Sequence, residues 1–124
     1  MLHIEKLSDG VLEIRPTGKL QESDFRSLAI QIDGWIKSSG HLRLLVNATA
    51  FEGWADTHAA SEHFRFVRDH HEKVDRIALL AGHEWQHWIA SFAAHFVHPE
   101  LRVFKATERT QAMAWLQEPL RKAS

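Results

Sequence analysis

HLRLLVNATAFEGW, which spans His41–Trp54, contains a strand pattern around which the rest of the chain can be arranged. Its apolar run, Leu42–Val46, is interrupted only by Arg43 and follows Ser-Ser-Gly, which predicts a strand buried on both faces. Such strands lie inside parallel sheets, and open α/β sheets usually bind ligands where a central strand ends in a loop. We therefore expect functional residues in the segment Asn47–Trp54.

The residues before this strand predict a hairpin and a helix. The turn signal Ser8-Asp9-Gly10 separates the apolar residues of Leu2–Leu7 from those of Val11–Ile14, which is typical of two antiparallel strands. Helical spacing over Gln21–Ser39 predicts an amphipathic helix, with Gly40 at a position that suits its end. The inner stripe that we expect for this helix is Phe25, Leu28, Ala29, Ile32 and Ile36.

The residues after the strand alternate between helices and strands. Helices are predicted over Ala55–Asp69 and Glu84–Phe96, and a last helix follows Thr107, whose hydroxyl can cap it. Strands are predicted over Val74–Ala81 and Leu101–Phe104. For the helix Ala55–Asp69 we expect Phe66 to lie off the inner stripe, which is Ala59, Ala60, Phe64 and Val67.

The resulting order, ββαβαβαβα, predicts an α/β fold. Alternating strands and helices imply right-handed crossovers, and hence a mixed, mostly parallel five-stranded sheet with four helices. The first strand should be antiparallel and lie at or near an edge of the sheet. No repeat, linker or low-complexity segment divides the 124 residues, so we expect one domain over 1–124, with a frayed tail at 120–124.

Composition narrows the classes of function. The 15 basic and 16 acidic residues give a formal charge of −1, so no strong field steers the chain towards nucleic acid. Without cysteine, the chain has no disulfide framework, no thiolate nucleophile and no cysteine-based zinc site. The start MLHIEKLSDG lacks the pattern of a signal peptide, and no apolar run approaches the ~20 residues of a membrane span. We expect a cytoplasmic protein that does not bind nucleic acid.

Short motifs along the chain carry a family resemblance. They are Gly18-Lys19-Leu20, Asp24-Phe25, Leu44-Leu45-Val46, Phe51-Glu52-Gly53-Trp54, Arg76-Ile77-Ala78, Trp85 with Trp88, and Ala112-Met113-Ala114-Trp115-Leu116. In this order they resemble the STAS domains (sulfate transporter and anti-sigma-factor antagonist) and, more closely, the SpoIIAA-like family, also described as STAS/SEC14-like. The resemblance implies a small non-enzymatic module that binds an apolar ligand or associates with membranes, and that commonly forms homodimers.

One region departs from the pattern of the anti-sigma-factor antagonists. Those proteins carry a phosphorylated serine in an Asp-Ser-Ser-Gly-like turn at the start of the second helix, where this chain reads Asn47–Gly53 without a serine. Thr49 is a poor substitute for that serine, and Asn47 stands where an aspartate is usual. The sequence therefore argues against a phosphorylation switch of that type.

The predicted helix Glu84–Phe96 has an aromatic face. Its apolar residues recur at spacings of three and four: Trp85, Trp88, Ile89, Phe92 and Phe96. They either pack on the sheet or, with Phe51 and Trp54 across a cleft, line an apolar pocket or dock on a bilayer. The polar side of the helix has no Lys or Arg, which favours a pocket or lid over stable membrane binding. The candidate ligand-binding residues are Phe51, Trp54, Trp85, Trp88 and Phe92.

Histidines raise the question of a metal site. His83-Glu84-Trp85-Gln86-His87 matches the H-E-x-x-H pattern of zinc proteases. However, Gly82 places His83 at the start of the predicted helix rather than inside it, and no third ligand stands at a recognisable offset. Solvent-exposed or capping histidines are the simpler interpretation, so we expect neither a metal nor a cofactor.

Three functional hypotheses follow from the sequence. The first is a non-enzymatic binding module for an apolar or lipid-like ligand, with transient contact at a membrane. The second is a regulatory domain related to the anti-sigma-factor antagonists, which meets a protein partner through its second helix and the loop before it. The third is a zinc hydrolase that uses His83, Glu84 and His87.

Overall fold

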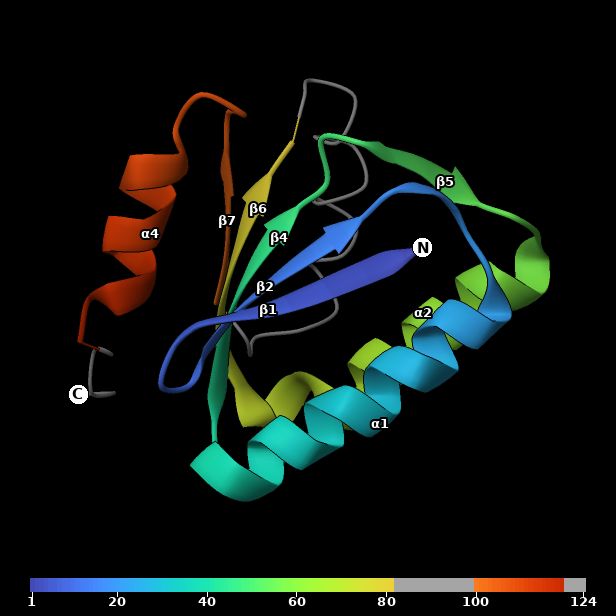
Figure 1. The fold of residues 1–124 in the computed structure, drawn as a ribbon, viewed down its shortest axis with the longest axis horizontal. Coiled ribbons are helices and arrows are strands. Elements are labelled where there is room, and N and C mark those ends of the chain that lie inside the picture. Colours follow the sequence, from blue (N-terminus) through green and yellow to red (C-terminus); the bar gives the residue numbers. More distant parts are fainter. Residues whose placement is uncertain (82–99, 120–124) are drawn as a thin grey trace.

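The computed structural model describes residues 1–81 and 100–119 of the chain. Five strands form one sheet in the order β1-β2-β4-β6-β7 (Figure 1). Their bounds are β1 Leu2–Ser8, β2 Val11–Pro16, β4 Leu42–Asn47, β6 Val74–Leu80 and β7 Glu100–Phe104. Strand β1 pairs with β2 in antiparallel orientation at the edge, and the other neighbours are parallel. The mixed, mostly parallel five-stranded sheet is therefore confirmed.

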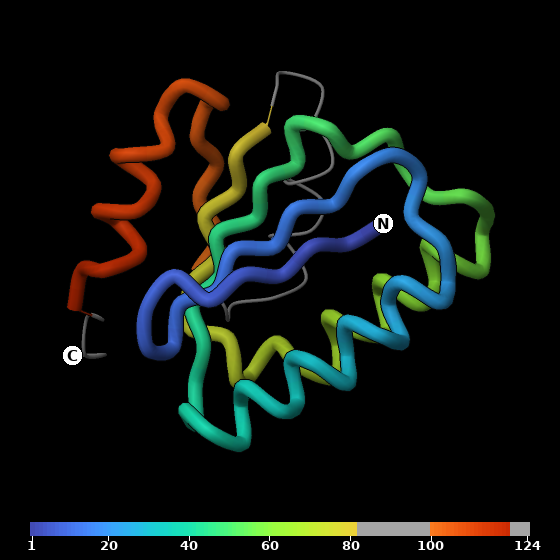
Figure 2. Tube along the Cα trace, in the orientation of Figure 1, coloured from blue at the N-terminus to red at the C-terminus, as the bar shows by residue number. Residues whose placement is uncertain are grey.

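Helices cover both faces of this sheet. The described residues contain α1 (Glu22–Ser39), α2 (Thr57–His70) and α4 (Arg109–Gln117), with a 3₁₀ turn, η1, at His71–Lys73. Helices α1 and α2 lie side by side and run in the same direction (Figure 2), and α4 lies on the other face. The predicted helix Glu84–Phe96 lies outside the described residues. No helix in the described ranges has the length and apolar character that crossing a membrane requires.

Strand β4 lies at the centre of the sheet and is buried on both faces. Leu42 and Leu44 point into the core beneath α1 and α2, whereas Leu45 points into a second core beneath α4. These three leucines are at most 4% exposed. Successive side chains of a strand alternate between faces, so a continuous apolar run is what a strand between two helical layers requires.

Helix α1 follows its predicted pattern. Phe25, Leu28 and Ile32 are buried against the sheet. Gly40 ends the helix with a φ of +83°, and its N–H donates to the Ile36 carbonyl. Glycine suits this position because side chains rarely adopt a positive φ.

The predicted inner stripe of α2 is right at Ala59 but wrong at Phe64 and Phe66. Phe64 is 51% exposed, whereas Phe66 packs against the core beneath α1 and α2. The residues that face inward include Ala59, His63 and His70, and His70 Nε2 donates to Asp33 Oδ1 of α1 at 2.8 Å. The spacing 59, 63, 66, 70 is helical, so two histidines occupy positions that an apolar pattern leaves out.

The segment Phe51–Trp54 forms a strand that the sequence pattern did not predict. This strand, β5, pairs in parallel with β3 (Gly18–Leu20) to form a separate two-stranded sheet. Helix α2 begins only at Thr57, where the Asp56 carboxylate caps it by accepting from Ala59 N–H at 2.9 Å. The β3–β5 pair connects the carboxyl edge of the main sheet to the start of α1 and α2.

Helix α4 begins one residue later than a Thr107 cap would place it. Glu108 occupies the N-cap position, and its side chain accepts from the Lys105 N–H at 2.7 Å.

The opposite end of α4 is bound by two arginines of the sheet. Arg76 donates to the Trp115 and Glu118 carbonyls at 2.8 and 2.9 Å, and Arg43 donates to the Leu116 and Glu118 carbonyls. The last carbonyls of a helix lack partners within it, and here the arginines supply them.

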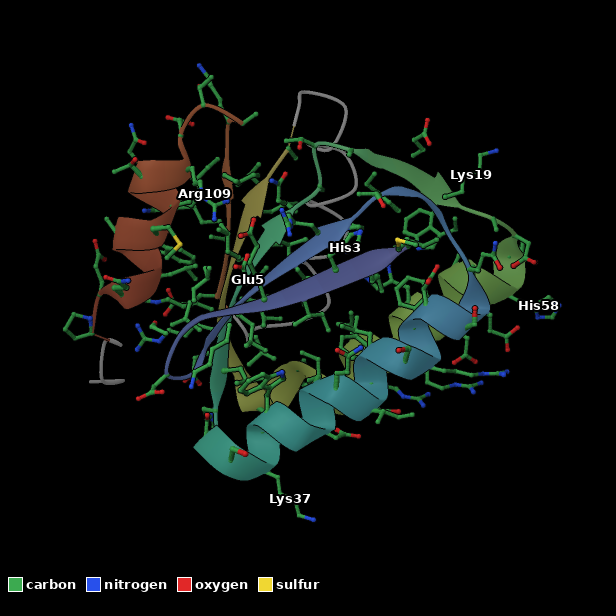
Figure 3. The ribbon with its side chains drawn as sticks, viewed as in Figure 1. His3, Glu5, Lys19, Lys37, His58 and Arg109 are labelled. Carbon is green, nitrogen blue, oxygen red and sulfur yellow. The ribbon has the colours of Figure 1, made fainter. Side chains whose placement is uncertain are left out.

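A buried carboxylate lies beside the first turn of α4. Glu13 of β2 is 3% exposed, and both of its carboxylate oxygens accept from Arg109, at 2.7 and 2.8 Å. The guanidinium of Arg109 lowers the pKa of Glu13, chiefly through these hydrogen bonds, against an opposing effect of burial. Figure 3 shows Arg109 on the same side of the sheet as Glu5 and His3 of the edge strand.

Candidate functional site

Four rings from three elements form an aromatic cluster beside the carboxyl edge of the sheet: Phe25, Phe51, Trp54 and His63. The Phe51 and Trp54 rings meet edge to face with centroids 5.4 Å apart, and the Phe25 and His63 rings stack at 4.8 Å. Trp54 and Phe51 are half-buried and pack against the main core. The cluster thus extends the core of the protein outward into the loop region after β4.

One hydrogen bond fixes the chemical form of His63. Trp54 Nε1 donates to His63 Nδ1 at 3.1 Å. An indole nitrogen can only donate, so Nδ1 is the unprotonated nitrogen and the ring proton is on Nε2. Burial lowers the pKa of His63 to about 4. His63 is therefore neutral at pH 7, and the cluster carries no net charge there.

The structure places two of the five candidate ligand residues. Phe51 and Trp54 come together on β5, as expected from their shared segment. Trp85, Trp88 and Phe92 lie outside the described residues, as do His83, Glu84 and His87. Within residues 1–81 and 100–119, no group of three His, Asp or Glu side chains is arranged to hold a metal ion.

The loop between β4 and β5 is closed by a side chain. Asn47 Oδ1 accepts from the Thr49 N–H at 3.2 Å and from the Thr49 hydroxyl at 2.7 Å. Asparagine is favoured in such turns because its side chain can replace a backbone acceptor. Thr49 is exposed and lies eight residues before the start of α2.

Comparison with protein families shows to which family the chain belongs. Residues 11–117, and thus most of the sequence, match the SpoIIAA-like family. The chain belongs to the SpoIIAA-like family. A search among curated proteins gives no match.

Solved structures share the SpoIIAA-like fold. An uncharacterised DUF3478-family protein of Shewanella loihica PV-4, with a SpoIIAA-like fold, is 23% identical over 94% of this chain and 92% of that chain, with a TM-score of 0.76. The anti-sigma factor antagonist SpoIIAA in its unphosphorylated form is 14% identical over 92% and 98%, with a TM-score of 0.60. The phosphorylated Bacillus cell fate determinant SpoIIAA is 13% identical over 91% and 99%, with a TM-score of 0.54. The predicted family is confirmed, as is the α/β fold with a mixed, mostly parallel five-stranded sheet.

Sequence reasoning missed two members of the aromatic cluster of this SpoIIAA-like domain. Phe25 was expected in the core, but not as a ring that stacks on a histidine. His63 was not among the candidate residues. Its position four residues after Ala59 and three before Phe66 is the signal that could have identified it as an inward-facing ring.

The low pKa of His63 predicts acid sensitivity. Between its ordinary value of 6.5 and about 4, the unfolded chain binds a proton that the folded protein does not. The free energy of unfolding should therefore not depend on His63 protonation above pH 6.5. It should fall by up to about 3 kcal/mol as the pH drops from 6.5 to 4. Urea unfolding at a series of pH values measures this slope.

A matched pair of variants isolates the contribution of His63. His63→Gln keeps an acceptor for Trp54 but does not titrate, so its stability should depend less on pH than that of the wild type. His58→Gln changes an exposed histidine of the same helix (Figure 3) and should keep the wild-type slope. Equal slopes for the wild type and His63→Gln would contradict the prediction.

Proposed function

We propose that this SpoIIAA-like domain is a non-enzymatic binding module for an apolar or lipid-like ligand, acting in the cytoplasm with transient contact at membranes. The observation that supports this function best is the aromatic cluster. Trp54 and Phe51 present large rings that are only half-buried, on the short strand β5 just after the loop that follows the central strand. Ligands of open α/β sheets usually bind at this edge.

The chemistry of the aromatic cluster favours an apolar ligand over a polar one. The polar atom of the Trp54 ring is used by His63, and His63 is neutral at pH 7. Sites for such ligands are lined mainly by hydrophobic and aromatic side chains, with few polar groups. A ligand that meets Phe51 and Trp54 would therefore meet ring surface rather than charge.

A binding measurement tests this function. Oleic acid, added below its micellar concentration, should produce a saturable blue shift of tryptophan emission, and native mass spectrometry should detect a one-to-one complex. Trp54→Ala should lose both signals while circular dichroism shows an intact fold. Trp35→Ala removes a tryptophan near the carboxyl end of α1, beside the amino ends of the parallel strands, and should keep both signals. The absence of a saturable response in the wild type would overturn the proposal.

A second candidate function is regulatory contact with a protein partner. Phe64 on α2 is 51% exposed, with Arg65 and Arg68 of the same helix also exposed. Aromatic side chains are enriched at the centres of protein interfaces, and polar side chains surround them at the rim. This candidate is favoured if a partner protein binds the wild type but not Phe64→Ser, while both proteins bind oleic acid equally well.

A further inference from the structure

A cleft lies at the edge of the sheet opposite the aromatic cluster. The β1–β2 turn, the carboxyl ends of α1 and α4, and the starts of β4 and β6 enclose about 730 Å³. Pockets of this size are typical of small-molecule sites. The cleft is separate from the site proposed above, because it borders the amino ends of the parallel strands rather than their carboxyl ends.

An ammonium group lies over an indole ring in this cleft. Lys6 Nζ is 5.7 Å from the centroid of the Trp35 ring, and it pairs with Asp9 Oδ1 at 3.0 Å. Tryptophan is the aromatic side chain that attracts cations best, and a neighbouring carboxylate adds to that attraction. Trp35 and Asp9 together therefore form an element that recognises an ammonium ion.

The lysine that occupies this element can be displaced at little cost. The side chains of Lys6 and Asp9 are 46% and 100% exposed. Ion pairs this exposed contribute little to stability, and the long side chain of lysine can extend into water instead. A ligand cation would exchange with Lys6 without breaking any buried contact of the protein.

The other charges around the cleft leave this element available to a cation. The guanidinium of Arg43 is directed to the Leu116 and Glu118 carbonyls at the end of α4. The ring of His41 is paired with Asp75, with Nδ1 and Oδ1 3.0 Å apart. Helix α1 ends beside Trp35, and the carboxyl end of a helix carries a partial negative charge that attracts cations.

We propose that this cleft binds a small organic ammonium ion, which lies on the Trp35 ring in the place that the Lys6 ammonium takes in this structure. A quaternary ammonium such as choline suits the ring, because its charge is spread over methyl groups that are easily desolvated. The same group is available free in solution or as the headgroup of phosphatidylcholine.

A titration with choline chloride tests the proposal. The chain has five tryptophans, so its ¹⁵N spectrum has five indole signals, and the one that Trp35→Phe removes belongs to Trp35. This signal should shift saturably with choline and not with sodium chloride at equal ionic strength. Phosphatidylcholine vesicles provide the second source, and a shift with either source supports the site. No saturable shift with either would overturn it.

Removal of the competing lysine gives the sharpest result. Lys6→Ala should bind choline about threefold more tightly, because no intramolecular ammonium then occupies the ring. Asp9→Asn should bind it more weakly. Lys19→Ala, which removes an exposed lysine of β3 (Figure 3), controls for net charge and should bind as the wild type does. Weaker binding by Lys6→Ala would show that Lys6 holds the cleft together, and would overturn the proposal.

Discussion

Replacement of Arg76 with alanine is expected to lower the free energy of unfolding by about 3–5 kcal/mol, the range seen when a buried charged network loses one partner. The Arg76 guanidinium is 3% exposed and donates to three carbonyls at the end of α4: Trp115, Glu118 and Pro119. It also lies 5.1 Å from the Trp115 ring. Alanine would remove a charged donor from each of these carbonyls and leave a void beneath the helix.

Arg102→Ala is the matched control for this prediction. Arg102 also stacks on the Trp115 ring, at 5.5 Å, but it is exposed. Its loss should cost less than about 1 kcal/mol, as is usual for an exposed cation–π contact. Urea unfolding curves of the two variants give both values. Equal losses would show that the ring contact, rather than the hydrogen bonds to α4, accounts for the effect of Arg76.

Arg109→Met is expected to destabilise the protein by about 3 kcal/mol at pH 7, because it leaves the Glu13 carboxylate buried without its cation. Arg109 is itself 46% exposed, which places the effect at the lower end of the range for buried pairs. In the double variant Glu13→Gln/Arg109→Met no unpaired charge is buried. Its stability should therefore exceed that of Arg109→Met alone.

The mutation Arg109→Met reverses how the contribution of Glu13 to protein stability depends on pH. In the wild type the pKa of Glu13 is lowered, so its stabilising contribution is complete above the ordinary value of 4.5 and is lost as the pH falls through the folded pKa. In Arg109→Met burial raises that pKa and only the smaller effect of the Arg15 charge opposes it, so the deficit relative to the wild type should shrink as the pH falls. Arg15→Met, an exposed arginine two residues from Glu13, is the control. A deficit of the same size in Arg15→Met would contradict the prediction.

Local patterns predicted the main sheet well. The apolar run Leu42–Val46 and the turn at Asp9-Gly10 each depend on residues that are neighbours in sequence, and both elements appear where expected. Gly40 likewise ends α1. Hydrophobic periodicity carries this information because burial on one face or on both is what selects the residue types along each element.

Contacts between distant residues were not predictable in the same way. Strands β3 and β5 have three and four residues, too few to show an alternating pattern, and they pair across 33 residues from Gly18 to Phe51. The inward position of His63 was missed because histidine is counted as polar, although a neutral ring with a bound Nδ1 packs as an aromatic one. Arg43 was noted only as an interruption of an apolar strand, and its partner at Glu118 is 75 residues away.

The attachment of α4 also determines when the second core can form during translation. The second core joins Val11, Leu45 and Ala78 of three successive parallel strands to Ala112 and Leu116 of α4. A nascent chain that has released β6 from the ribosome therefore exposes this apolar face until residues 109–117 have also emerged. Apolar surface left open on a growing chain is where chaperones bind and where aggregation begins. Arg43 and Arg76 hold that helix in place from the moment it arrives, because they already stand in the strands that it must cover.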